Sequence, residues 1–168
     1  MTSVPQQPRL AFDPLERAGE LWEDRIGDAT AMRLATSIMR VQQLVIGRLD
    51  AALKPHGITF ARYEVLRLIS FSREGRLPLS KIGERLMVHP TSVTNAIDRL
   101  EAHGLVVRQP DPDDRRRTFA ALTPEGERVV EAATAALMDV QFGVAELDPA
   151  DQQAAYTLLR GLRQVDFA

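Results

Sequence analysis

Cysteine is absent from the 168 residues of the sequence. Disulfide bonds and thiol chemistry are therefore excluded, and an intracellular, cytoplasmic protein is expected, because disulfides are typical of secreted chains. No apolar run approaches the roughly 18 residues needed to span a bilayer, so no membrane association is expected. Residues 1–12 contain prolines and glutamines where a signal peptide needs an apolar core, and they are expected to form a disordered lead-in.

Aromatic residues make up only 5% of the chain, and runs of β-branched residues are nearly absent, which favours a mainly helical fold. Start and stop signals predict a series of helices and one hairpin. The helices are expected over residues 14–25, 29–53, 60–72, 81–86, 90–100, 124–145 and 149–165, and the two strands over 104–109 and 116–123. We expect Ser80 to cap the short fourth helix, and Tyr63, Leu66 and Phe71 to point into the core.

Lysine is scarce too, because only Lys54 and Lys81 occur among the 21 basic residues. The net charge of −2 is an average over unlike segments. Residues 31–122 carry 15 Lys and Arg against 9 Asp and Glu, whereas the two ends together carry 6 against 14. A basic middle between acidic ends favours a nucleic-acid surface displayed by a separate scaffold, although an ordinary mixed surface remains an alternative.

The stretch "VHPTSVTNAIDRL", residues 88–100, places many short polar side chains on a helix. One face of this helix is apolar at helical spacing and consists of Val93, Ala96, Ile97 and Leu100. The opposite face carries Thr91, Asn95 and Asp98. Short donors and acceptors let a helix approach base edges in a major groove, and Pro90 at the first helical position leaves free N–H groups for a phosphate. The alternative is a polar cap on a buried helix.

The residues around this stretch complete a DNA-binding pattern. The short helix 81–86, a tight turn at 87–89 and the helix just described form a helix-turn-helix, and the hairpin that follows it is a wing. In the turn "DPDDRRRT", Asp113 and Asp114 precede three arginines. Asp114 can hold the guanidinium of Arg116 in a direction suited to a narrow minor groove, although a charged, solvated turn is the alternative.

At these residues the chain resembles the MarR family of bacterial winged-helix regulators over about residues 31–144. The resemblance is carried by an Asp-Arg-Arg followed by Leu-Thr-x-x-Gly, which here are Asp114, Arg115, Arg116, Leu122, Thr123 and Gly126. It implies a mainly α fold with a small β-hairpin wing, in which a winged helix-turn-helix lobe joins a helical dimerisation region. The expected parts are N-terminal helices 13–57 for dimerisation and ligand binding, the DNA-binding lobe 58–122, and C-terminal dimerisation helices 123–168.

The resemblance also implies a homodimer that binds double-stranded DNA at a palindromic operator, usually as a repressor, and is released by a small anionic or phenolic ligand. Arg116 would enter the minor groove with Asp114 as its anchor. The full set of expected DNA contacts is Ser80, Lys81, His89, Pro90, Thr91, Ser92, Thr94, Asn95, Arg99, Asp114, Arg115, Arg116 and Arg117.

The additional first helix, which carries the only tryptophan, Trp22, is similar to that of the urate-responsive branch of the family. Glu64 departs from that branch, which prefers Asp there, and this puts urate itself in doubt. The residues expected to line an effector pocket are Trp22, Arg25, Arg40, Gln43, Arg62, Tyr63, Glu64 and Arg99. Several arginines near one tryptophan suit a carboxylate or a urate-like anion, whereas a hydrophobic staple is the alternative role for Trp22.

An enzyme is not expected, because the sequence contains no nucleophile elbow, P-loop or dinucleotide-binding fingerprint. The three histidines are too scattered to predict a metal site, and no cofactor is expected. Two other classes stay open: a winged-helix module that binds only proteins, and a DNA-binding protein without an effector. Added salt distinguishes a protein-binding module from a DNA-binding protein, because DNA binding weakens steeply as salt is added.

Overall fold

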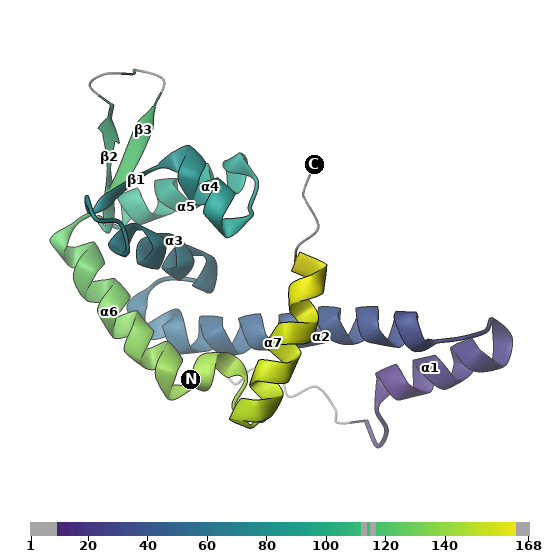
Figure 1. Cartoon of the computed structure of the whole chain (residues 1–168). Helices are drawn as coiled ribbons and strands as arrows, with labels where there is room; N and C mark the ends of the chain where they lie inside the picture. The colour runs from purple at the N-terminus through teal and green to yellow at the C-terminus, as the bar shows by residue number, and fades with distance from the viewer. Residues whose placement is uncertain (1–9, 112–113, 115–116, 164–168) are drawn as a thin grey trace. The chain divides into compact units, whose positions relative to one another are not determined.

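The structure is a computed structural model that describes residues 10–111, 114 and 117–163 (Figure 1). The chain divides into two compact units, of which the first ends at Leu44 and the second begins at Val45. Each unit is described by itself. Among the described residues, no helix has the length and apolar character required to cross a membrane.

The first unit consists of α1 (Pro14–Arg25) and the first part of α2 (Thr30–Leu53). Helix α1 begins where expected, because an Asp13 carboxylate oxygen accepts a hydrogen bond from the Leu15 N–H at 2.8 Å. Gly19 leaves room on α1 for the Arg33 side chain, since a Cβ there would lie 2.0 Å from Nε of Arg33. The Arg33 guanidinium is ion-paired with Glu23, which ties α2 to α1.

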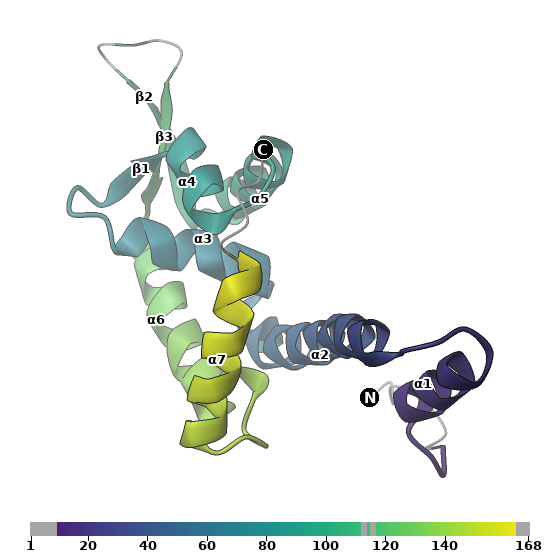
Figure 2. The same ribbon diagram turned by 45° about the vertical axis from the view of Figure 1, so that its right-hand side comes forward.

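The second unit contains the winged helix-turn-helix lobe, in which three helices pack against a small antiparallel sheet (Figures 1 and 2). Its elements are α3 (Phe60–Ser70), β1 (Arg76–Pro78), α4 (Leu79–Leu86), α5 (Pro90–Ala102), β2 (Val106–Pro110) and β3 (Thr118–Leu122). The strand order is β1-β3-β2, and Pro78 lies opposite Phe119 in the β1–β3 pair. The largest fully buried side chains, drawn from α2 to α6, are Leu53, Leu66, Ile69, Ile82, Ile97, Leu100, Val106, Val130 and Leu137.

The rest of the second unit is helical. A short 3-10 helix, η1 (Lys54–His56), precedes the lobe, and α6 (Pro124–Asp139), η2 (Gln141–Gly143) and α7 (Pro149–Arg163) follow it. Arg48 of α2 holds the α6–α7 connection by donating to the Gly143 carbonyl oxygen at 2.7 Å and pairing with Glu146 at 2.6 Å. Helix α7 buries none of its described residues.

The mainly α fold with a wing is confirmed, but one strand was missed and three local expectations were wrong. The strand β1 was missed because it has only three residues, too few to establish a period, and ends in proline. Phe71 is 74% exposed because α3 ends at Ser70. Ser80 does not cap α4, which begins at Leu79, two residues earlier than expected, with Pro78 at the N-cap position. Helix α6 ends at Asp139 rather than near residue 145, because the backbone turns left-handed at Gln141 and Phe142, with φ of 46° and 51°.

Candidate nucleic-acid interface

The turn between α4 and α5 sets the geometry of the helix-turn-helix. Met87 adopts the left-handed conformation, with φ 54° and ψ 44°, and the Val88 N–H donates to the Gly83 carbonyl oxygen at 3.1 Å. Gly83 is buried where the helices meet, since a Cβ there would lie 3.3 Å from both the Val88 carbonyl oxygen and the Val93 side chain. The small residue at 83 therefore allows the tight turn that places α5 beside α4.

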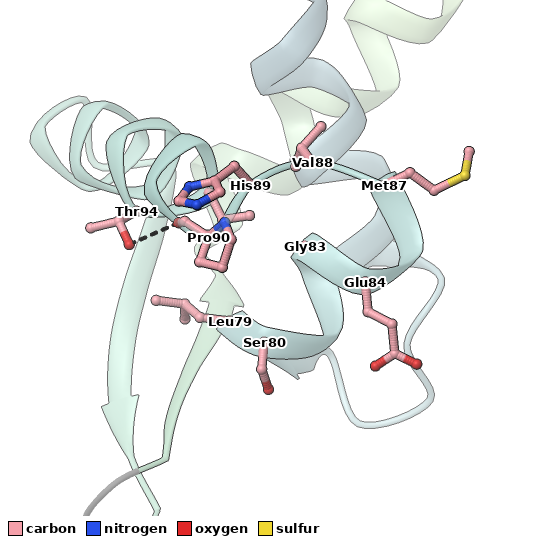
Figure 3. A pocket seen from close by; sticks show the side chains of 10 residues that line it. Leu79, Ser80, Gly83, Glu84, Met87, Val88, His89, Pro90 and Thr94 are labelled. Atoms are coloured by element: carbon pink, nitrogen blue, oxygen red, sulfur yellow. Dashed lines mark hydrogen bonds between the residues drawn. The ribbon is translucent and has the colours of Figure 1, made fainter. Parts of the chain in front are cut away.

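Helix α5 begins with an N-cap supplied by a histidine. Nδ1 of His89 accepts a hydrogen bond from the Thr91 N–H at 3.2 Å, and Pro90 occupies the first helical position, as expected. The cap therefore uses Nδ1 as its acceptor and leaves Nε2 outside this hydrogen bond. The Thr94 hydroxyl donates to the Pro90 carbonyl oxygen at 3.2 Å, as Figure 3 shows.

The two faces of α5 separate as the sequence predicted. Val93, Ile97 and Leu100 are buried in the core. The side chains on the outer face, all expected to contact DNA, are exposed: Thr91, Ser92, Thr94, Asn95 and Arg99. A helix anchored by its apolar face therefore presents short polar groups to the outside.

Two concave surfaces flank this face of α5. The first, of about 780 Å³, lies between α4 and α5 and is lined by four residues expected to contact DNA, Ser80, His89, Pro90 and Thr94 (Figure 3). The second, of about 730 Å³, lies between the start of α3 and α5, and its lining includes Arg62, Ser92, Asn95 and Arg99. Lys81 belongs to neither lining; it is exposed on α4 and paired with Glu84 at 2.7 Å.

Arg108 of β2 connects the wing to α5, and sequence reasoning missed it. Its backbone N–H donates to Glu101 at 3.1 Å, and its guanidinium donates to Glu101 and, at 2.5 Å, to Asp98. Asp98, expected on the polar face of α5, is thus held by the wing strand. The alternation of acid and arginine over residues 98–108 was the only sequence signal for this link.

The described part of the wing is organised around Arg117. Its N–H donates to the Asp114 carbonyl oxygen at 2.9 Å, and its carbonyl oxygen accepts from the Asp111 N–H at 3.1 Å. The Arg117 guanidinium lies 3.6 Å from the carboxylate of Asp111, and 5.6 Å from the centre of the Phe119 ring. Asp113, Arg115 and Arg116 lie outside the described residues, and so does the expected pair of Asp114 with Arg116.

Comparisons with known proteins decide the family. The sequence profile of the MarR family matches residues 58–118. The structure of Sco5413, a MarR family transcriptional regulator from Streptomyces coelicolor, is 53% identical with a TM-score of 0.74; the match covers 79% of this chain and 92% of that one. The chain belongs to the MarR family.

Two further MarR-family structures are similar to this chain. Sco3205 from Streptomyces coelicolor, solved in complex with DNA, is 25% identical over 78% of this chain and 87% of its own, with a TM-score of 0.71. CouR from Rhodococcus jostii RHA1, bound to p-coumaroyl-CoA, is 30% identical over 80% and 94%, with a TM-score of 0.66. The match spans 65%, 54% and 49% of the lengths of three curated relatives, all transcriptional regulators from Bacillus subtilis.

The structure explains the Leu-Thr-x-x-Gly motif of this MarR-family chain as a junction. The Thr123 hydroxyl donates to the Gly104 carbonyl oxygen at 2.7 Å and accepts from the Gly126 N–H at 3.0 Å. The Thr123 N–H donates to the Leu105 carbonyl oxygen at 3.1 Å. The motif thus joins the start of α6 to the segment between α5 and β2, and its role is structural.

The residues expected to bind an effector fall into separate places of the MarR-family chain. In the first unit, Arg40 donates to Gln43 at 2.9 Å, and both line a cavity of about 290 Å³ whose other walls include Leu15 and Met39. Trp22, 37% exposed, and Arg25, whose side chain is exposed, are not among the lining residues of that cavity.

In the second unit, Arg62 and Arg99 line the same concave surface, whereas Tyr63 is buried in the core. The Tyr63 hydroxyl lies 3.0 Å from that of Thr134 on α6. Glu64 is exposed on α3, and partial desolvation raises the pKa of its carboxyl. Among the residues that the structure describes, no group of three or more His, Cys, Asp or Glu side chains could hold a metal ion.

Proposed function

We propose that this chain is a sequence-specific DNA-binding transcriptional regulator, most simply a repressor, that acts in the cytoplasm on a palindromic operator and is released by a small anionic or phenolic metabolite. The observation that carries the proposal is the outer face of α5, where short polar side chains are exposed beside two concave surfaces. Such a face fits a major groove, because short side chains let the helix backbone approach the base edges. The DNA-bound relative supports the same use of the fold.

A homodimer is part of the proposal. In the described part of the chain, apolar side chains of α7 are left largely exposed: Tyr156, Leu158 and Leu162 to 56%, 79% and 59%. Contiguous apolar surface of this kind marks an interface, and a two-fold dimer reads a two-fold operator. The half-sites are expected about one helical turn apart, near 34 Å centre to centre.

The DNA-binding proposal is tested by selecting duplexes from a randomised library with the full-length protein. Enrichment of an imperfect palindrome is expected. Asn95→Ala should reduce the preference for the selected duplex over scrambled DNA, because one base-edge contact carries about 1–3 kcal/mol of discrimination. Arg116→Ala should weaken binding with little change in stability, whereas Arg128→Ala, on the exposed side of α6, should change neither. If no sequence is enriched, the proposal is wrong.

The cavity lined by Arg40 and Gln43 supports an effector with a charged and an apolar part. A lining that combines a guanidinium and an amide with the apolar side chains of Leu15, Ala35 and Met39 suits an aromatic acid or a phenol. CouR, a relative with a similar fold, was solved with p-coumaroyl-CoA bound, which supports an aromatic ligand for this fold. Trp22 on α1 supplies an optical signal, because it is the only tryptophan.

Titration with p-coumarate and urate, followed by Trp22 fluorescence and by operator binding, tests the effector. We expect quenching and release from DNA over the same concentration range, because a ligand displaces DNA only by favouring the DNA-incompetent state. Arg40→Ala should abolish both effects, and Trp22→Phe should retain DNA binding while raising the ligand concentration needed for release. Deletion of residues 1–27 also removes Trp22, so release from the operator is the measurement for that variant. If the ligand still releases it from DNA, the surface that contains Arg62 and Arg99 becomes the preferred effector site.

A further inference from the structure

A groove rich in arginine lies on the flank of the lobe, between the α3–β1 connection, α4 and the wing. Its volume is about 530 Å³, and its lining among the described residues contains four arginines and one acidic residue, Glu74. The arginines are Arg73, Arg76, Arg85 and Arg117. None of the roles described above uses this groove as a whole, although Arg117 belongs to the wing.

Two of the four guanidinium groups are held in place over one aromatic ring. Arg76 and Arg117 lie 4.5 Å and 5.6 Å from the centre of the Phe119 ring. Each also has an acidic partner, since Arg76 is 3.4 Å from Glu74 and Arg117 is 3.6 Å from Asp111. The ring and the two carboxylates thus order this wall of the groove.

The other two arginines give the groove its unbalanced charge. Arg73 and Arg85 are exposed, and neither forms an ion pair with any residue in the described part of the chain. The charges of Arg76 and Arg117 are offset by their acidic partners, so the guanidinium groups of Arg73 and Arg85 are the ones available to bind an anion. A planar guanidinium matches the oxygens of a phosphate and binds them with two parallel hydrogen bonds.

The position of the groove favours DNA over an acidic protein as the source of that anion. Pro78 lines the groove and immediately precedes α4, whose first turn carries Ser80 and Lys81. Arg117 also lines the groove, and it belongs to the wing turn. The groove therefore borders two segments that are proposed to contact DNA, which brings it close to the phosphate backbone that those segments would bind.

We propose that this arginine groove binds backbone phosphates next to those contacted by α4 and the wing, and thereby adds affinity that does not depend on sequence. The inference rests on the proposed DNA-binding function and names a further part of its interface. Because phosphate contacts release counterions, the groove contributes to the salt dependence of binding and leaves the choice of operator unchanged.

The test measures operator binding of the full-length protein by fluorescence anisotropy at several salt concentrations. The variant is the double substitution Arg73→Ala and Arg85→Ala, and the matched control, Arg17→Ala with Arg128→Ala, removes two exposed arginines outside the groove. We expect the slope of log K against log salt to fall by about two, one for each phosphate contact. Affinity should fall roughly tenfold or more on operator and scrambled DNA alike.

A Lys double variant, Arg73→Lys with Arg85→Lys, should keep most of the slope because it keeps both charges, and it controls for misfolding. If the slope of log K against log salt is unchanged in the Ala variant, the inference is overturned. The proposed function is tested separately, by whether the wild-type protein prefers the operator to scrambled DNA. If the Ala variant binds DNA like wild type but loses binding to a polyglutamate peptide, the groove belongs to an acidic protein segment, and the inference is equally overturned.

Discussion

The α-carbon of Gly126 faces the carbonyl oxygen of Leu105 so closely that a Cβ at Gly126 would lie 2.0 Å from that oxygen. The same carbonyl accepts the Thr123 N–H, which precedes α6. The start of α6 and the segment between α5 and β2 are therefore in backbone contact, and only glycine permits it.

Gly126→Ala should lower the free energy of unfolding by about 1–3 kcal/mol, because backbone atoms must move to admit the methyl group. Chemical denaturation monitored by circular dichroism measures it. Gly47→Ala on α2 is the control, since the described structure leaves open space around its Cβ position. This control should be neutral or slightly stabilising, because alanine is the better helix former. Equal stability of the two variants would contradict the close contact.

Arg108→Met should weaken operator binding although Arg108 is not among the proposed DNA contacts. Loss of its pairing with Asp98 and Glu101 frees the wing strand from α5, so the two DNA-contacting elements are no longer held together before binding. We expect an affinity loss of roughly threefold to tenfold, which corresponds to about 1 kcal/mol for a partly exposed ion-pair network. Arg128→Met serves as the control, and wild-type affinity of Arg108→Met would rule out the linking role.

His89 caps α5 through Nδ1, and its other ring nitrogen, Nε2, takes no part in the cap. Two substitutions separate the cap from a DNA contact through Nε2. His89→Ala should destabilise the protein by about 1 kcal/mol because it removes the N-cap acceptor, whereas His89→Asn should retain most of the stability. Both variants lose Nε2. Weaker operator binding in both therefore indicates a contact from His89 to DNA, and weaker binding in His89→Ala alone indicates that the histidine only starts α5.

The ion pair between Glu131 and Arg67 predicts a pH-dependent difference in stability. Arg67 donates to the Glu131 carboxylate at 2.8 Å and holds the pKa of Glu131 below its ordinary value of 4.5. A carboxyl with a lowered pKa stabilises the folded state above its unfolded pKa, and the stabilisation is lost as the pH falls through the folded value.

Glu131→Gln should therefore have a lower Tm than wild type at neutral pH, and the two values should converge as the pH falls below the ordinary glutamate pKa of 4.5. Thermal unfolding followed by circular dichroism at a series of pH values measures the difference. Glu127→Gln, on the same helix and exposed, is the control. A Tm difference that persists at low pH would mean that the carboxylate charge is not its cause.

Most of the secondary structure could be predicted because its signals lie within a few residues of one another. Asp13-Pro14 and Thr123-Pro124 mark helix starts by local hydrogen bonds and a fixed φ angle, and both helices begin there. The spacing of Val93, Ile97 and Leu100 predicted which face of α5 is buried. The early end of α6 was missed because non-glycine residues, Gln141 and Phe142, adopt the left-handed conformation, which their side chains do not signal.

The sequence by itself determined the helix-turn-helix, the wing and the polar face of α5, since periodicity and caps are properties of a short segment. Only the tertiary structure decided which distant groups meet: Arg108 with Asp98, Gly19 with Arg33, and the four arginines of the groove. The physical reason is that these contacts depend on how strands and helices pack, and a charged side chain has the same pattern in the sequence whether it pairs within the fold or faces solvent.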